Sequence, residues 1–368
     1  KIEQNSKLYD QDFKYVTNKI IKISDLSFSY KEKNDVLKNV NFDFVTGQAI
    51  GIVGSSGSGK TTLGDLLMGL YKPKNGLITI DGKVMAVAFM ANTQHLYVRT
   101  DVLKENGIAI PKTYEAVVAA SEKIRAAGKM KYPYAAAYKA GWNLAEEFVN
   151  MYIGHGGEFF DAGSAKPSIN NAKGVATLNM LKKLADLSNP DFLTHDSEAI
   201  KVEWEAGNVA IMTLWASRAG TLLDAEGDAK ITAATKLIAP ATVGGGSIPA
   251  TTLWWDGFTL AKNRSDADAE ASFRAMAHAA SSKEMVAKAA DQAVWLIEGF
   301  KPGPKSVGVI KAVQMGAKPY PMLPQMGLMH GALGNEIVEF LQGNETAEQA
   351  LKDVEAAYMT KAKEQGFL

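Results

Sequence analysis

The 368-residue sequence contains no cysteine, and its five histidines lie far apart. Without cysteine the chain has neither a disulfide framework nor a thiolate site, and the histidines lack the spacing of metal ligands. No apolar run approaches the length that spans a bilayer. The formal net charge is zero, and lysines alternate with acidic residues rather than clustering as in a nucleic-acid-binding surface. We therefore expect no direct membrane insertion and no nucleic-acid partner.

The first part of the chain also lacks residue types that are common in the rest. Residues 1–82 contain a single alanine and no arginine or tryptophan, whereas the rest is alanine-rich and holds every arginine and all six tryptophans. Such a change usually separates segments of different origin. We therefore expect two segments joined near residues 81–84. No charged segment followed by an apolar one opens the chain, so we expect that a secretion signal was removed or never present.

The clearest motif is GSSGSGKT at residues 54–61, between a short apolar strand at 49–53 and a helical pattern at 60–70. This is a full phosphate-binding loop (Walker A). Its glycines let successive N–H groups point at one anion, Lys60 can reach the terminal phosphates, and Thr61 can ligate Mg²⁺. The expected ATP contacts of the loop are Gly54, Ser55, Gly57, Ser58, Gly59, Lys60, Thr61 and Thr62. The alternative is a Gly/Ser-rich turn without a ligand.

Around this loop, residues 20–82 resemble the start of the nucleotide-binding domain of exporter-type ABC transporters. The likeness rests on ISDLSFSY at 23–30, VLKNV at 36–40 and GLITIDG at 76–82. It implies that Tyr30 stacks on adenine, although a tyrosine ending a β-rich run is otherwise an edge-strand packing residue. Hydrolysis needs further acidic and charge-stabilising groups. The chain has no LSGGQ signature and no Asp-Glu pair, so we expect ATP binding without hydrolysis and no enzyme activity.

From residue 83 onward the chain resembles the extracellular carbohydrate-binding proteins of ABC importers. The stretches that carry the likeness follow the family order and are GKVMAVAF at 82–89, NTQHLYV at 92–98, DVLKENG at 101–107, PKTYE at 111–115, GGEFFD at 156–161, GNVAIM at 207–212, WDGF at 255–258 and TAEQAL at 346–351. The family's opening part, which builds half of the first lobe and half of the cleft, is missing. The transporter-ATPase segment takes its place, so the chain is interpreted as a chimera.

The resemblance implies an α/β fold with the two lobes of a periplasmic binding protein, in which a phosphate-loop segment at 1–82 partly replaces the first lobe. Residues 83–368 would form the solute-binding remainder. The second lobe is expected at about 99–240, and the rest of the first lobe with the closing helices at about 241–368. The parent proteins work with membrane transporter subunits, on opposite sides of the membrane. No localisation is therefore predicted for the whole chain.

Apolar residues recur at helical spacing in four stretches of the second part. The predicted helices cover residues 114–127, 172–187, 267–280 and 347–361. Asn170 and Thr346 stand where helix N-caps are expected. Helices that alternate with short apolar strands are typical of an α/β architecture.

A sugar site needs flat aromatic faces for the C–H side of the ring and polar side chains for the hydroxyls. The candidate ligand contacts are Asn92, Trp142, Trp215, Arg218, Trp254, Trp255 and Asp256. The resemblance places Trp215 where family members often have a ligand-facing aromatic residue. It places Trp255 and Asp256 where the chain crosses back beside the cleft. For each tryptophan the alternative is a core position.

Four further residues are assigned from their positions in the sequence. Asn92 and Tyr97 lie near the crossing between the lobes and could contact either the ligand or the hinge. Trp204 and Trp295 are expected to be structural.

Three hypotheses for function remain open from the sequence. The first is a sugar-binding protein whose affinity is impaired by the loss of half its cleft. The second is an ATP-binding module that uses Lys60 and Thr61. The third is a recombination of two fold fragments without native activity. Sugar binding, as in the first hypothesis, requires no cofactor.

Overall fold

A computed structural model describes most of the chain. The described residues are 20–29, 35–45, 59, 62–63, 66, 75–80, 87–223, 228–261, 263–281, 283–297 and 299–368. The chain divides into two compact units, residues 1–87 and 88–368. Each unit is described by itself.

The described part of the first unit contains a three-stranded antiparallel sheet in the order β2-β1-β3. Its strands are β1 (Ile20–Phe28), β2 (Leu37–Val45) and β3 (Asn75–Ile80). A small core forms on this sheet from Ile23, Leu26, Phe28, Leu37 and Leu66. The strand predicted at 49–53 lies outside the described residues.

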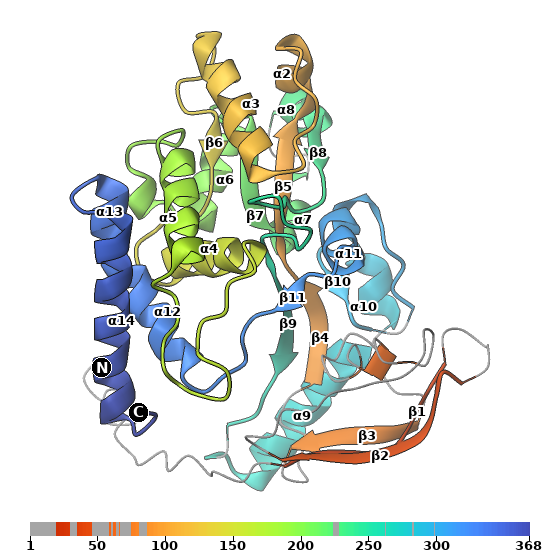
Figure 1. Cartoon of the computed structure of the whole chain (residues 1–368). Coiled ribbons are helices and arrows are strands. Elements are labelled where there is room, and N and C mark those ends of the chain that lie inside the picture. The colour runs from red at the N-terminus through yellow and green to blue at the C-terminus, as the bar shows by residue number, and fades with distance from the viewer. Residues whose placement is uncertain are drawn as a thin grey trace. The chain divides into compact units, whose positions relative to one another are not determined.

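The second unit contains two four-stranded mixed sheets (Figure 1). The lobe-1 sheet has the order β10-β4-β9-β11 and consists of β4 (Val87–Asn92), β9 (Thr252–Phe258), β10 (Val294–Trp295) and β11 (Lys318–Pro319). The lobe-2 sheet has the order β6-β7-β5-β8 and consists of β5 (Gln94–Arg99), β6 (Tyr134–Ala135), β7 (Ile211–Trp215) and β8 (Thr235–Leu237). Only Thr93 separates β4 from β5, so the chain passes directly from one sheet to the other.

Helices flank both sheets (Figure 1). Their bounds are α2 (Thr100–Glu105), α3 (Tyr114–Ala126), α4 (Trp142–Gly154), α5 (Ala172–Ala185), α6 (Ser197–Glu205), α7 (Ala219–Leu222), α8 (Ala229–Ala234), α9 (Asp266–Ser281), α10 (Lys283–Lys288), α11 (Val307–Gln314), α12 (Met326–Glu336), α13 (Val338–Gln342) and α14 (Ala347–Glu364). Short 3₁₀ turns are η2 (Phe192–Thr194), η3 (Ala216–Arg218) and η4 (Pro304–Ser306). The four helices predicted from apolar spacing are confirmed as α3, α5, α9 and α14.

Side-chain caps fix where several of these helices begin. The Thr346 hydroxyl accepts the Gln349 N–H at the start of α14, as predicted. The predicted cap at Asn170 is wrong by one residue, because Asn171 accepts the N–H groups of Lys173 and Gly174 at the start of α5. The backbone N–H of Asn170 instead donates to Glu355 on α14. The sequence offers two adjacent asparagines, and tertiary contacts select the second.

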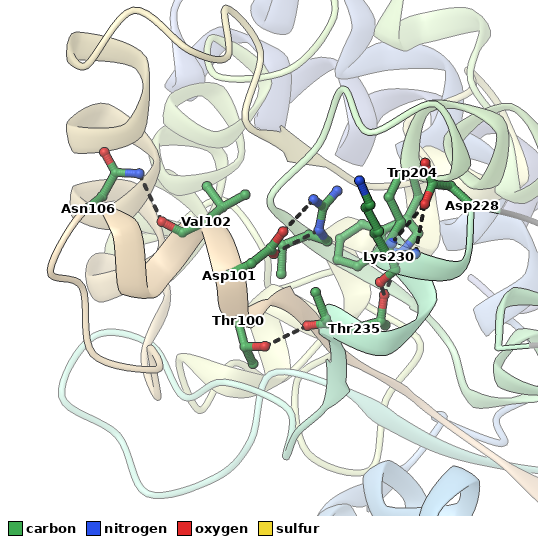
Figure 2. A network of polar contacts seen from close by, with 11 residues as sticks. Thr100, Asp101, Val102, Asn106, Trp204, Asp228, Lys230 and Thr235 are labelled. Carbon is green, nitrogen blue, oxygen red and sulfur yellow. Dashed lines mark hydrogen bonds and ion pairs between the residues drawn. The ribbon is translucent and has the colours of Figure 1, made fainter.

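A polar network lies where β5 ends and β8 begins in the lobe-2 sheet (Figure 2). The Thr100 hydroxyl donates to the Ala234 carbonyl at 2.8 Å, and the Trp204 indole donates to the Thr235 hydroxyl at 3.2 Å. Asp228 caps α8. Because Trp204 is only 1% exposed and its polar atom is bonded within the fold, it is a core residue.

Helix α4 is the central helix of the second unit. It packs against α12 and α5, which both also contact α14 (Figure 1). The approach of α12 to the start of α4 is close, because the Gly141 N–H donates to the Gly334 carbonyl at 2.9 Å. A Cβ at Gly334 would lie 2.2 Å from the Gly141 carbonyl oxygen. Only glycine therefore fits at this position of α12.

Gly334→Ala is expected to destabilise the protein by about 1–3 kcal/mol, because the added methyl group must push α12 away from α4. The matched control is Gly331→Ala on the same helix, where a Cβ meets nothing within 4 Å. That change should stabilise α12 by up to about 1 kcal/mol through helix propensity. Urea unfolding at equilibrium measures both. Equal effects of the two changes would contradict the close packing of α4 and α12.

Within the ranges given above, no helix combines the length and apolar character that a membrane span needs.

Candidate functional site

The two crossings between the sheets are bonded to each other. Thr93 lies between β4 and β5, and Thr251 immediately precedes β9. The Thr93 hydroxyl donates to the Thr252 carbonyl, and the Thr251 hydroxyl donates to the Gln94 carbonyl, both at 2.9 Å. Both threonine side chains are fully buried. Because buried hydroxyls are costly without partners, these reciprocal bonds hold the crossing segments side by side.

Helix α4 presents a buried polar row to the same crossings. Gln94 donates from Nε2 to Glu147 Oε1 at 2.9 Å and accepts from Asn150 Nδ2 at 3.2 Å. Asn150 Oδ1 in turn accepts the Thr252 N–H at 2.7 Å. The Thr252 hydroxyl lies 2.6 Å from Glu146 Oε1 and 2.7 Å from Asn150 Oδ1. Helix α4 is therefore bonded to the first residue of each strand that leaves the crossing, Gln94 of β5 and Thr252 of β9.

Next to this row lies an aromatic cluster, here called the tryptophan cluster, of Trp142, Trp215, Trp254, Tyr320 and His330. Its residues come from α4, β7, β9, the end of β11 and α12. The Trp142 ring centroid lies 6.2 Å from that of Trp215 and 6.0 Å from that of Trp254, and the Trp254 and Tyr320 centroids are 4.5 Å apart. Trp142 remains 50% exposed. The cluster thus offers an accessible aromatic surface at the junction of the two sheets.

Hydrogen bonds orient the members of the tryptophan cluster. The Trp254 indole N–H is shared between the Thr252 hydroxyl at 2.8 Å and Glu146 Oε1 at 3.1 Å. His330 bonds the Tyr320 hydroxyl through Nδ1 at 2.9 Å and the Trp142 carbonyl through Nε2 at 3.0 Å. Burial lowers the pKa of His330, so its ring is neutral in neutral solution. These hydrogen bonds use the polar atoms at the edges of the Trp254, Tyr320 and His330 rings and so fix the orientation of the rings.

The two carboxyl groups of α4 are both held in an apolar environment. Burial raises the pKa of Glu146 and of Glu147 to about 8, and the two groups also repel each other when charged. Within the described ranges neither of them has an ion-pair partner. Both are therefore protonated and neutral at neutral pH. A neutral carboxylic acid can donate one hydrogen bond as well as accept.

The predicted ligand contacts fall into three groups. Trp142, Trp215 and Trp254 lie together in the tryptophan cluster. Trp255 is 37% exposed, and because side chains alternate along β9 it lies on the opposite face from Trp254. Burial raises the pKa of the next residue, Asp256.

Two further predicted contacts lie around η3, just after Trp215. Asn92 bonds both the N–H and the hydroxyl of Ser217 at 3.2 Å, and Arg218 forms an ion pair with Glu198 of α6. Tyr97 is fully buried, and its hydroxyl donates to the Trp215 carbonyl at 2.9 Å. These bonds fix the backbone that carries Trp215.

Sequence reasoning missed Glu146, Tyr320 and His330 as parts of this site. The signal for Glu146 was a pair of glutamates inside an otherwise apolar helical stretch, which implies buried carboxyl groups and hence a polar network. No local pattern marked Tyr320 or His330. Only the packing of α12 against α4 brings them to Trp142.

Most of the predicted ATP contacts lie outside the described residues, namely Tyr30, Gly54, Ser55, Gly57, Ser58, Lys60 and Thr61. Gly59 has φ +87°, a conformation that favours glycine. Thr62, Leu63 and Leu66 are helical, as the pattern at 60–70 predicts. Among the described residues no group of three or more potential ligands could hold a metal ion.

Part of the chain is similar to ATP-binding proteins of transporters. It is 46% identical over 63 residues to a putative ABC transporter ATP-binding protein of Bacillus cereus, which is 17% of this chain and 11% of that protein. It is 44% identical over 68 residues to the energy-coupling factor transporter ATP-binding protein EcfA1 of Mesomycoplasma hyopneumoniae, covering 18% of this chain and 25% of that protein. The chain thus spans a quarter or less of the length of these curated relatives.

Solved structures share the fold of the larger part. Maltose-bound MalE3 of T. maritima superposes with a TM-score of 0.65 at 20% identity, over 77% of this chain and 74% of that one. A solute-binding protein of Agrobacterium vitis with bound D-mannitol gives a TM-score of 0.63 at 18% identity, over 78% and 75% of the two chains. A solute-binding protein of Agrobacterium radiobacter, in complex with ribitol, gives 0.63 at 19% identity, over 75% and 71%. The predicted mixed α/β, two-lobe, periplasmic-binding-protein-like fold is therefore confirmed.

The family comparison covers more than half of the sequence. Residues 30–315 match the family described as bacterial extracellular solute-binding protein. The matched range includes part of the segment that resembles a transporter ATPase, so the chimeric origin stays a prediction. The chain belongs to the bacterial extracellular solute-binding protein family.

Proposed function

We propose that this chain binds a neutral sugar or polyol against the tryptophan cluster. The observation that carries the proposal is the meeting of Trp142, Trp215 and Trp254 at the junction of the two lobes, with ring centroids 6.0–6.2 Å apart. Aromatic faces suit the C–H side of a sugar ring. The carboxyl groups behind them are neutral at neutral pH, which suits a ligand without charge.

The known ligands of similar structures support this class of solute. Proteins with the same fold are described with bound maltose, D-mannitol and ribitol, all of them neutral polyhydroxy compounds. In our proposal Asn92, Arg218 and Asp256 supply polar groups at the rim. Binding proteins of this kind work with membrane transporter subunits, and we include such subunits as partners.

A thermal unfolding screen tests the proposal. Maltose, D-mannitol and ribitol are added separately in excess, and the unfolding midpoint is recorded. A solute that binds only the folded state at a hundred times its Kd should stabilise the protein by about 2.7 kcal/mol. A charged amino acid such as glutamate serves as the negative control. Stabilisation by the charged compound alone would overturn the assignment of a neutral ligand.

A second proposal concerns the phosphate-binding loop. The GSSGSGKT sequence at 54–61 and the similarity to ATP-binding proteins support binding of Mg-ATP through Lys60 and Thr61. The chain has no Asp-Glu pair for hydrolysis, so turnover is not part of the proposal.

Mg-ATP is expected to raise the unfolding midpoint of the wild-type chain and to have no effect on Lys60→Ala, which loses the ammonium group for the phosphates. The matched control is Lys38→Ala, a change of an exposed lysine on β2. An equal shift in all three proteins would mean that ATP binds elsewhere. No shift in any of them would remove ATP as a ligand and leave the solute site as the function.

A further inference from the structure

We propose that Glu146 is a positioning residue of the solute site, whose carboxyl group holds the Trp254 indole in place and whose protonation state therefore tunes solute affinity. The inference rests on the proposed function.

The geometry behind the proposal is a single carboxyl oxygen placed between two polar groups. Glu146 Oε1 accepts from the Trp254 indole at 3.1 Å and lies 2.6 Å from the Thr252 hydroxyl, which is also 2.7 Å from Asn150 Oδ1. The side chain is 0% exposed. The second oxygen, Oε2, is buried and has no hydrogen-bond partner among the described residues. One carboxyl group thus fixes the ring of Trp254 and the start of strand β9 together.

Glu146 also links two aromatic faces that come from different elements. Trp142 lies on the same helix one turn earlier, at the spacing that places side chains on one face. Trp254 lies on β9, and its ring centroid is 6.0 Å from that of Trp142. The carboxyl group bonds the Trp254 ring, and Trp142 lies on the same helix as Glu146. A solute stacked against this pair of rings would sense any movement of Glu146.

Among the described residues, the surroundings of Glu146 offer no positive charge to stabilise an ionised form. On α4 its ionisable neighbour is Glu147, and at the end of β11 it is Tyr320, whose pKa is raised by burial and by the nearby Glu146 charge. From α12 the neutral His330 bonds Tyr320. Beyond Glu147 lie the buried tyrosines Tyr114, Tyr134 and Tyr138, each with a pKa raised by burial and by the Glu147 charge.

Ionisation must therefore disturb the site. Burial raises the pKa of Glu146 to about 8, so the proton is lost in mildly alkaline solution. The charge then rests partly on Oε2, which is buried and has no partner within the described part of the chain. A buried unpaired charge is unfavourable enough that the carboxylate must turn or admit water. Either response changes the hydrogen bond to Trp254, and solute affinity should fall as the pH rises from 6 to 9.

The test follows the indole N–H signal of Trp254 by ¹⁵N NMR, assigned through its loss in Trp254→Phe. In the wild-type chain this signal should move with pH. It should also move in the control Glu147→Gln, because the carboxyl group changed there bonds Gln94 and not Trp254. In Glu146→Gln it should stay constant, close to its wild-type position at pH 6. In Glu146→Ala it should be displaced at every pH. A pH-independent signal in the wild-type chain, or equal spectra for the Gln and Ala variants, would overturn the proposal.

Affinity for whichever of maltose, D-mannitol or ribitol binds gives the second readout. At pH 6, Glu146→Ala should weaken binding by about tenfold or more, whereas Glu146→Gln should stay within about threefold of wild type. Between pH 6 and 9, affinity should fall in the wild-type chain and stay level in Glu146→Gln. If none of the three compounds binds, the proposed function fails, and the Trp254 signal still decides whether Glu146 positions the indole.

Discussion

Trp142→Ala and Trp215→Ala should each weaken binding of the solute by about 30- to 1,000-fold, or about 2–4 kcal/mol, because each removes a central aromatic face. Both rings lie at the junction of the lobes and are kept in place by their neighbours. Trp142 is half exposed in the free protein, so about half of its surface is free for a ligand. Isothermal titration calorimetry with the solute found by the unfolding screen measures the loss.

Two control variants separate binding from folding. Trp295→Phe keeps the packing against Phe89 and loses only the bond to the Ala289 carbonyl, so it should bind like the wild-type chain. Trp255→Ala removes a predicted contact on the other face of β9. If Trp255→Ala abolishes binding while Trp142→Ala does not, the ligand surface lies on the far side of β9 and the present assignment is wrong.

Glu146→Gln combined with Glu147→Gln should raise the free energy of unfolding at pH 8 by several kcal/mol and change it little at pH 4. Burial raises the folded-state pKa of each group to about 8 from the ordinary glutamate value of 4.5. The folded chain therefore holds protons that the unfolded chain releases. Stability is fully present below the unfolded pKa and is lost as the pH rises towards 8, by about 1.4 kcal/mol per pH unit for each group.

Each single Gln variant should remove part of this slope, because the two carboxyl groups also repel each other when ionised. Glu122→Gln, at an exposed position on α3, is the matched control for the substitution itself. Urea unfolding between pH 4 and 9 gives the profiles. A wild-type protein that gains stability from pH 5 to pH 8, with the same gain in the double variant, would contradict neutral buried carboxyl groups on α4.

The sequence was sufficient for the elements whose signal is local. The helical spacing of apolar residues placed α3, α5, α9 and α14 within a few residues of their bounds, and the hydroxyl of Thr346 marked the start of α14. The cap of α5 was misplaced because Asn170 and Asn171 are chemically identical. The Glu355 carboxylate accepts the backbone N–H groups of Ile169 and Asn170 and so holds the segment that precedes the cap at Asn171. Such a choice depends on a residue far away in the chain.

The candidate site could be predicted only in part, for the same reason. Trp142, Trp215 and Trp254 are candidates from the sequence alone, because the flat face of a tryptophan suits the C–H side of a sugar ring. Glu146 and His330 act through hydrogen bonds to other elements, and nothing in their own neighbourhood in the sequence shows those partners. The sequence also does not decide whether a tryptophan lies in the core or in a binding site. That depends on which face of its strand is covered by other elements of the fold.

The indole N–H signals of the six tryptophans test the central claim most directly. They are recorded by ¹⁵N NMR while maltose, D-mannitol or ribitol is added. Our account predicts that the signals of Trp142, Trp215 and Trp254 shift together and saturate. The signals of Trp204 and Trp295, whose N–H groups are bonded to Thr235 and Ala289, should stay in place. Saturable shifts confined to Trp204 or Trp295, with the tryptophan cluster unchanged, would contradict it.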